Sequence, residues 1–211
     1  MDYNIISTGS QGNAVAINSA ILIDCGVPFK ALQGIHKDIK LVLLTHTHAD
    51  HFNKITIRRL ARERPTLRFG GCVWIAGYLV DLGVNTRNID IFETEKMYKY
   101  TFAEVEAIPL VHNVPNCGYK IFMGGEKLIY ATDTNSISHV QARNFDLYML
   151  EANYSEATIV ERIRDKQAQG LHCYEYDVLN NHLSKEKADN WLYENMGSNS
   201  SYIYMHQHKE V

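Results

Sequence analysis

The chain has 211 residues, which is enough for one domain with a substantial core and short for two. A hydrophobic fraction of 45% and a charged fraction of 21% are ordinary for a soluble globular protein, and no apolar stretch approaches the ~20 residues of a membrane span. The net charge of −3 gives no general preference for nucleic acid, although it does not exclude such a partner. We therefore expect a single domain over residues 1–211 that does not cross a membrane.

The cysteine pattern and the N-terminus indicate a reducing compartment. The four cysteines are scattered and include no CxxC pair, so a disulfide framework is not expected at this size. The N-terminus lacks the basic start and long apolar region of a signal peptide. We predict a cytoplasmic protein in which these thiols are reduced: Cys25, Cys72, Cys117 and Cys173.

Short apolar segments separated by turns predict strands in the first quarter of the chain. Three of them surround a glycine-rich turn, at Ile5–Ser7, Ala14–Ile17 and Ala20–Asp24. Pro28 favours the start of a short helix. The continuous apolar run Lys40–Thr45 predicts a strand that is buried on both faces.

Helices and further strands follow. Apolar residues at helical spacing predict helices at Ile55–Glu63 and Ile75–Leu82, and Gly83 ends the second. Six strands are expected next, at Ile89–Phe92, Met97–Tyr100, Val105–Pro109, Gly118–Met123, Lys127–Ala131 and Leu147–Glu151.

The last quarter of the chain returns to helices. A helix is expected at Glu156–Lys166, and Gly170 breaks the chain after it. Ser184 is a good N-cap for a helix over Lys185–Met196, and Ser201–Met205 reads as a final strand. Strands and helices interleaved in this way indicate a layered α/β (α+β) architecture.

Four potential metal ligands follow the buried strand directly: His46, His48, Asp50 and His51. Because His46 and His48 are two residues apart on extended chain, their side chains point to the same side. Neutral imidazole and carboxylate are good ligands for zinc and related divalent ions. A single histidine at a strand end is usually an ordinary surface residue, but three with an aspartate in this arrangement rarely are. The run therefore predicts half of a binuclear metal site.

The run His46–His51 resembles the HxHxDH signature of the metallo-β-lactamase superfamily. Later positions of that family also match in order, at His112, Asp133 and His206. The resemblance implies a four-layer αβ/βα sandwich with two divalent metal ions at one edge.

The resemblance also implies how the ligands are shared between the two metals. The first metal would take His46, His48 and His112, the second would take Asp50, His51 and His206, and Asp133 would bridge them. His208 is an alternative to His206, because the chain closes with Gln207–Val211 where family members usually continue with Leu-Ser and an asparagine-rich segment. Zinc is the default metal for so many histidines, and manganese is chemically possible.

Four further segments resemble the YycJ/WalJ-type branch of this superfamily, a nuclease-like group related to ribonuclease Z: Thr8–Ala14, Leu22–Gly26, Glu151–Ser155 and Asn181–Ser184. The branch implies a phosphodiesterase or nuclease that acts on DNA or RNA. Its His-Leu-Ser segment makes His182 the candidate general acid for the leaving oxygen. Without the resemblance, His182 would read as a surface residue beside a helix.

Chemistry at such a centre has a defined form. Two divalent ions about 3.5–4 Å apart lower the pKa of a shared water, and the resulting metal-bound hydroxide would attack phosphorus in line. Asp50 would steer that hydroxide, and His182 would protonate the leaving oxygen. Asn13 and Asp24 are candidates for orienting the ligands, and equally for ordinary turn residues.

Other functions remain open at this point. The chain carries no long insertion of the kind that forms the flexible tRNA-gripping arm of ribonuclease Z, so typical tRNA processing is less favoured. A hydrolase of a small molecule such as a cyclic nucleotide is the main alternative, and a non-catalytic metal-binding protein is the third. A basic stretch after the motif could contact phosphates or could be a solvated helix face: Lys54, Arg58, Arg59, Arg62, Arg64 and Arg68. A homo-oligomer is possible but nothing in the sequence indicates one.

Overall fold

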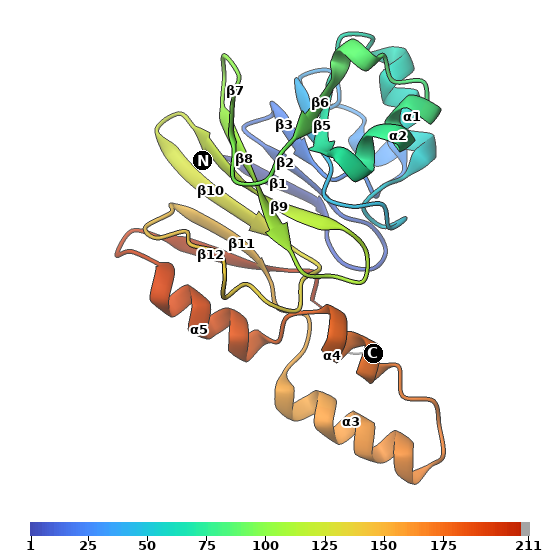
Figure 1. Ribbon diagram of the computed structural model, residues 1–211, viewed down its shortest axis with the longest axis vertical. Coiled ribbons are helices and arrows are strands. Elements are labelled where there is room, and N and C mark those ends of the chain that lie inside the picture. The colour runs from blue at the N-terminus through green and yellow to red at the C-terminus, as the bar shows by residue number, and fades with distance from the viewer. Residues whose placement is uncertain (208–211) are drawn as a thin grey trace.

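The computed structural model describes residues 1–207 and contains two six-stranded sheets (Figure 1). The strands of the first sheet lie in chain order: β1 (Tyr3–Ser7), β2 (Ala14–Ile17), β3 (Ile21–Ile23), β4 (Leu41–Leu43), β5 (Arg68–Cys72) and β6 (Ile89–Phe92). The second sheet is likewise ordered: β7 (Met97–Lys99), β8 (Glu104–Leu110), β9 (Asn116–Met123), β10 (Glu126–Ala131), β11 (Leu147–Glu151) and β12 (Ser201–Met205).

Each sheet begins with antiparallel pairs and ends with parallel ones. In the first sheet, β3, β4, β5 and β6 are parallel neighbours. In the second sheet, β10, β11 and β12 are parallel, and β8 runs in the same direction because two antiparallel pairings separate it from β10. Parallel strands end at one edge of a sheet, so residues that follow several of these strands are brought together there.

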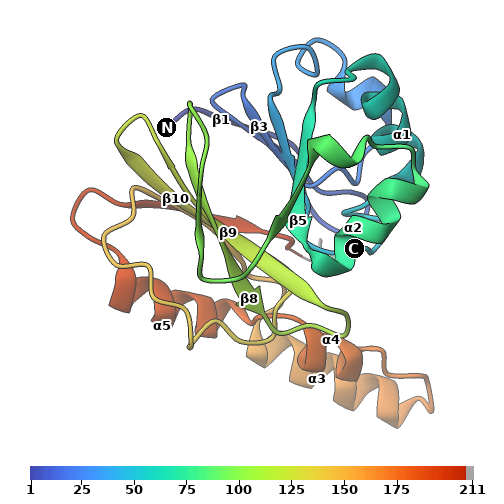
Figure 2. The same ribbon diagram turned by 45° about the horizontal axis from the view of Figure 1, so that its top comes forward.

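Helices cover the outer faces of both sheets (Figures 1 and 2). On the first sheet lie α1 (Lys54–Glu63) and α2 (Val73–Asp81), with the short 3₁₀ helices η1 (Phe29–Leu32) and η2 (Thr86–Asn88). On the second sheet lies α5 (Lys185–Asn195). The expected four-layer order of helix, sheet, sheet and helix is confirmed.

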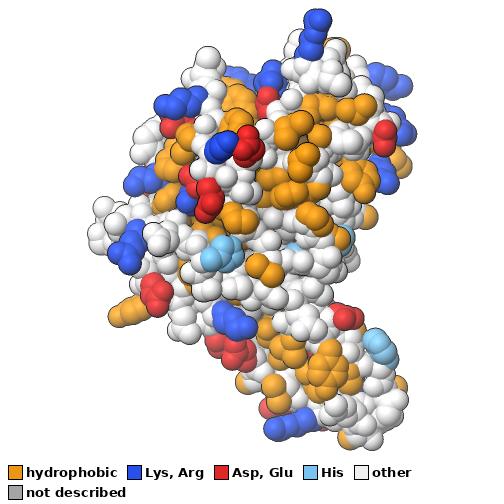
Figure 3. Space-filling view, viewed as in Figure 1, with side chains coloured by type: hydrophobic (Ala, Val, Ile, Leu, Met, Phe, Trp, Pro, Cys, Tyr) orange, Lys and Arg blue, Asp and Glu red, His pale blue; other side chains and the backbone are white. Residues whose placement is uncertain are grey.

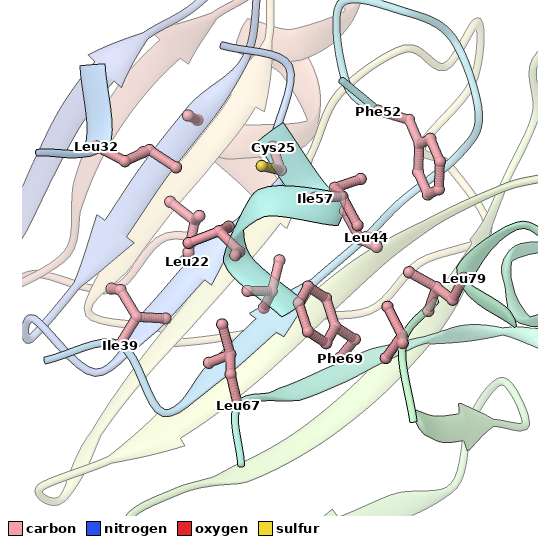
Figure 4. Packing of buried hydrophobic residues seen from close by; sticks show 14 of the residues in the cluster. Leu22, Cys25, Leu32, Ile39, Leu44, Phe52, Ile57, Leu67, Phe69 and Leu79 are labelled. Carbon is pink, nitrogen blue, oxygen red and sulfur yellow. The ribbon is translucent and has the colours of Figure 1, made fainter. Parts of the chain in front are cut away.

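Three buried apolar clusters fill the three interfaces between these layers. Figure 4 shows the first, in which Ile57 of α1 and Leu79 of α2 pack on Leu22, Leu44 and Phe69 of the first sheet. The second lies between the two sheets, and the third lies under α5. Strands β2, β3 and β4 are buried on both faces, and they read as continuous apolar runs rather than as alternating ones.

A helical arm projects from this body (Figure 1). It consists of α3 (Glu156–Ala168) and α4 (Glu175–Asn181), and we call residues 156–181 the α3–α4 arm. Lys166 and the buried Glu175 hold its two helices together with an ion pair of 2.7 Å. The arm shows that this chain does carry a projecting element, although no long insertion produces it.

Three elements were not expected from the sequence, namely β5, α4 and the short 3₁₀ helix η2. Strand β5 contains Gly70 and Gly71, which carry no side chain to mark a strand, and a Cβ on Gly70 would lie 2.8 Å from the Phe92 ring. Helix α4 spans only seven residues, too few for a helical period to be recognised. The helices α1, α2, α3 and α5 lie where they were predicted, within two residues at each end. No helix in residues 1–207 is both long and apolar enough to cross a membrane.

Candidate metal centre

The candidate ligands all follow the ends of strands. His46 comes after β4, His112 after β8, Asp133 after β10 and His206 after β12. Asp133 and His206 adopt the left-handed backbone conformation, with φ of 56° and 51°. This conformation is uncommon for residues other than glycine, so tertiary contacts must hold it in place. It ends each strand abruptly and turns the following chain across the edge of the sheet.

Three imidazoles form the first group of donors, from His46, His48 and His112. Their ring centroids lie 4.7 Å (His46–His48), 5.3 Å (His46–His112) and 5.1 Å (His48–His112) apart. One nitrogen of each ring lies within 4.8 Å of the others, so one cation can be reached by all three. His46 is buried while the other two are half-buried, which leaves the group open on one side.

The second group contains Asp50, His51 and His206, with Asp133 between the two groups. Asp133 Oδ2 lies 2.7 Å from His51 Nε2, and Asp50 Oδ2 lies 3.5 Å from both His51 Nε2 and His206 Nε2. Asp133 is also close enough to His46 and His51 for the three to share one ion. The structure thus brings the seven residues expected as ligands to one place, whereas His208 lies outside the described residues.

Hydrogen bonds orient the imidazole rings so that one nitrogen of each faces the centre. His51 Nδ1 lies 2.6 Å from the buried Asp24 carboxylate, to which it donates. The Thr45 hydroxyl donates to Asp24 and therefore accepts from His46 Nδ1 at 3.0 Å. His112 Nδ1 donates to the Asn181 carbonyl at 3.0 Å. In each ring the Nε2 atom is then left as the metal-facing nitrogen.

Burial and neighbouring charges shift the pKa values of the candidate ligands, downward in the first group and upward for His206 in the second. Burial lowers the pKa of His46 to about 2, and the neighbouring His51 adds to that effect. Burial also lowers the pKa of His112. For His206, burial is outweighed by hydrogen bonds to Asp50 and Glu151, which raise its pKa to about 10. Without metal, positive charge therefore collects on the second group rather than the first.

The donor set fits divalent metal ions. Among residues 1–207, the buried Nε2 atom of His46 has no hydrogen-bond partner, which costs free energy unless something binds it. Imidazole nitrogens and carboxylate oxygens in this number are typical ligands for zinc and chemically acceptable to manganese. A metal-binding centre explains this unpaired atom and the histidines packed ring to ring.

Asn13 and Asp24 both contact the ligands. Asp24 lies beside His51 as described, and Asn13 Nδ2 lies 2.8 Å from His51 Nε2. The main chain of Asn13 also donates to the Asp50 carbonyl at 2.6 Å. These contacts favour the orienting role over the alternative of ordinary turn residues, because both side chains are fully buried against the motif.

His182 lies at the edge of the centre, at the C-terminal end of α4. Its ring stacks on His206 with centroids 5.3 Å apart, and its Nδ1 atom lies 2.6 Å from Glu151 Oε1. The side chain is 18% exposed, so a substrate at the centre can reach it. The position is not that of an ordinary surface residue beside a helix.

Glu151 is a candidate functional residue that sequence reasoning missed. Its carboxylate is fully buried at the end of β11 and contacts His182 Nδ1 and His206 Nδ1. It also accepts from the main-chain N–H groups of Thr134 (2.8 Å) and Leu183 (3.3 Å). The available signal was an acidic residue directly at the end of an apolar strand.

Comparison with known proteins places these features in a family. The sequence model of the beta-lactamase superfamily domain matches residues 19–176. The exodeoxyribonuclease YycJ of Bacillus anthracis is 23% identical over 149 residues, which cover 65% of this chain. The chain spans little more than half of that relative, since the match covers 56% of its length.

Solved structures share the fold at low sequence identity. The metallo-beta-lactamase fold protein YhfI of Bacillus subtilis has a TM-score of 0.73 at 16% identity, covering 99% of this chain and 87% of its own. The short form of human tRNase Z has a TM-score of 0.70 at 16% identity, and the match covers 98% of this chain and 92% of that structure. Zn²⁺-bound PqqB of Methylobacterium extorquens has a TM-score of 0.72 at 12% identity, covering 98% and 89%. These likenesses establish the fold.

Proposed function

The chain belongs to the beta-lactamase superfamily, and from that premise we propose that it is a binuclear metal-dependent phosphodiesterase that cleaves DNA or RNA. The observation that carries the proposal is the pairing of a buried His/Asp ligand cluster with His182, which Glu151 holds at its open edge. A metal-binding scaffold without catalysis would not need a partly exposed histidine bonded to a buried carboxylate in that position. The named activity of the YycJ relative supports the same substrate class.

We assign the first metal to His46, His48 and His112, and the second to Asp50, His51 and His206, with Asp133 shared. The grouping of their donor atoms supports this division. When bound, two divalent ions supply an activated water and neutralise negative charge on the phosphoryl oxygens. We infer zinc as the usual metal, because five of the seven ligands are histidines.

Asp50 and His182 divide the proton chemistry. Asp50 carries the most exposed carboxylate of the cluster, at 24%, and accepts the proton of an attacking water. His182 donates a proton to the leaving oxygen. Glu151 receives the Nδ1–H of His182, so it fixes the tautomer and the orientation of the ring that acts as the acid.

The test is a substrate panel for the metal-loaded protein. We expect hydrolysis of single-stranded DNA or RNA, measured by gel and by release of labelled nucleotides, with zinc or manganese added after chelation. Hydrolysis of cyclic nucleotides without any cleavage of polynucleotides would favour the small-molecule alternative. Binding of two metals with no turnover on any phosphodiester would refute the enzyme assignment.

The cellular setting follows the same proposal. The four cysteines are free thiols in the structure, and three of them are buried. Their reduced state supports a cytoplasmic location, where nucleic acids and nucleotides are available as substrates.

A further inference from the structure

The helix that follows the metal motif carries an unusual arrangement of charge. Of the six cations in this part of the sequence, three have structural partners. Arg59 pairs with Glu63 at 2.7 Å, Arg64 donates to the carbonyl oxygens of His36 and Ile39, and Arg68 pairs with Asp90.

The other three cations have no ion-pair partner among residues 1–207. They are Lys54, Arg58 and Arg62, all exposed and spaced four residues apart along α1. Residues at i and i+4 lie on the same face of a helix, so these three form one stripe about 12 Å long, at 1.5 Å per residue. We call them the α1 stripe. Figure 3 shows blue side chains at the right edge of the molecule, where α1 lies in Figure 1.

This arrangement costs local stability. Like charges at i and i+4 repel each other, and Lys54 places a cation at the first residue of a helix whose first turn has no acidic side chain. A solvated surface helix gains nothing from such a pattern, because alternating signs would stabilise it. A charge pattern that destabilises a helix without any structural benefit is expected mainly at functional sites.

The stripe begins just after the metal motif in the sequence. Asn53, which caps α1, is only two residues after the ligand His51. At the same end, the ring of Tyr78 is 45% exposed, and Lys54 Nζ lies 6.0 Å from its centroid. A groove or face that combines cations with an aromatic ring is the usual means of binding single-stranded nucleic acid, whose phosphates pair with the cations and whose bases stack.

The α3–α4 arm cannot take this role electrostatically. It carries five acidic and three basic side chains, and the whole protein has a net charge of −3. The α1 stripe therefore stands out against an acidic background as a surface that attracts a polyanion.

We propose that the α1 stripe binds the phosphate backbone of a single-stranded polynucleotide and leads it to the metal centre, with Tyr78 as a stacking platform. The inference rests on the proposed phosphodiesterase function and narrows its substrate from phosphodiesters in general to nucleic-acid chains. Each cation of the stripe neutralises one phosphate.

Binding of a labelled oligonucleotide tests the proposal directly. The probe is a 20-nucleotide single strand with phosphorothioate linkages, which slow cleavage, and binding is followed by fluorescence anisotropy at several salt concentrations. For Arg58→Gln/Arg62→Gln we expect Kd to rise roughly 20-fold at 0.1 M salt. The slope of log Kd against log salt concentration should fall by about 1.4, because each of the two lost phosphate contacts contributes ~0.7 to that slope. The matched control is Lys96→Gln/Lys99→Gln, which removes the same charge from residues paired with Glu93 and Glu104, and it should leave Kd nearly unchanged.

Two further measurements test whether the variant is still folded and whether the stripe prefers single strands to duplexes. The Gln variant should unfold at no lower temperature than the wild type, because repulsion is removed, and Arg58→Lys/Arg62→Lys should retain most of the affinity. Wild-type affinity and salt slope in the Gln variant would overturn the proposal. A duplex of equal length should bind more weakly because its bases cannot stack on Tyr78, and equal binding would overturn the single-strand assignment.

A small phosphodiester distinguishes this inference from the proposed function. Bis(p-nitrophenyl) phosphate is too short to reach beyond the metal centre, so the Gln variant should hydrolyse it at the wild-type rate. If the wild type binds oligonucleotide through the stripe but hydrolyses no phosphodiester, the proposed function fails and the stripe stands. If it hydrolyses both substrates and the stripe variant binds normally, the stripe fails alone.

Discussion

The two halves of the molecule contribute to the candidate centre in different ways. The half built on the first sheet supplies four ligands from one six-residue run, His46–His51, between β4 and α1. The half built on the second sheet supplies its ligands one at a time, from the ends of β8, β10 and β12. A site of this kind is therefore part local motif and part product of sheet topology, although both parts lie within a few ångströms of each other.

The two halves also hold their ligands by different means. Side chains of the first half, Asp24 and Thr45, hydrogen-bond to the histidine rings of the local motif. In the second half, side-chain amides also hold the main chain of the ligands: Asn116 donates to the Asp133 carbonyl at 2.7 Å, and Asn153 donates to the His206 carbonyl at 2.9 Å. The strained backbone at Asp133 and His206 needs this support.

The largest effect is expected from the first half, in Asp50→Ala. Loss of this carboxylate removes both a ligand of the second metal and the proton acceptor, so turnover should fall on the order of 10³-fold, as for loss of a direct transition-state contact. Steady-state kinetics on oligonucleotide, with metal content per chain by mass spectrometry, would measure both consequences. Asp81→Ala, an exposed change at the end of α2, is the control. Unchanged turnover in Asp50→Ala would contradict the assigned mechanism.

A smaller effect is expected from the second half, in His182→Ala. Loss of a general acid typically slows a reaction about 10²-fold or more, and both metals should stay bound because His182 is not assigned as a ligand. Glu151→Gln should lower kcat about tenfold, because the His182 ring loses the carboxylate that orients it. His172→Ala on the arm is the matched control. Metal loss from His182→Ala would mean that His182 is a ligand instead.

Gly26→Ala tests how far the local motif depends on its surroundings. A Cβ on Gly26 would lie 1.7 Å from the Asp50 carbonyl oxygen, so the motif must shift. We expect a loss of about 2 kcal/mol in the free energy of unfolding, measured with denaturant, together with weaker metal binding. Gly77→Ala, where nothing lies within 4 Å of the new Cβ, should be neutral or stabilising. Equal free energies of unfolding for Gly26→Ala and Gly77→Ala would contradict this prediction, because they would show that the metal motif can shift away from a new Cβ without cost.

The smallest effect concerns pH and separates the two metal groups. A metal ion binds neutral imidazole, and without metal the pKa of His206 is raised to about 10, chiefly by hydrogen bonds to Asp50 and Glu151 that outweigh burial. Burial of His51 is likewise outweighed by Asp24 and Asp133, which raise its pKa. Below pH 10 the second metal must displace the proton of His206 and, where His51 is protonated, that proton too, so its affinity should rise at least tenfold per pH unit and fall as pH falls. Metal binding to the first group should release few protons, because burial lowers the pKa values of His46 and His112 and both rings are already neutral. Calorimetry in two buffers of different ionisation enthalpy counts the protons, and equal release at both steps would contradict this division.

Much of the fold was accessible from the sequence because its signals are local. Ser184 was predicted to cap α5, and its side chain does accept a hydrogen bond from the Lys187 N–H. The apolar run before His46 was predicted as a buried strand, and it forms the buried strand β4. Strand β5 and helix α4 were missed because the first is glycine-rich and the second is short. Their identity depends on neighbours such as Phe92 and Lys166 that local spacing does not reveal.

The sequence by itself identified the motif His46–His51, since ligand chemistry and strand-end position are both written in one short segment, whereas the later candidate ligands were named from their resemblance to the family's order. Only the tertiary structure decided that His112, Asp133 and His206 meet that motif, because sheet topology brings the ends of distant strands to one edge. It alone also gave Glu151 its contact with His182, and it divided the basic stretch into arginines with ion-pair or hydrogen-bond partners and a stripe without an ion-pair partner in residues 1–207. Charge and hydrogen-bonding capacity belong to a residue, whereas a partner is fixed only when chain segments far apart in sequence pack together.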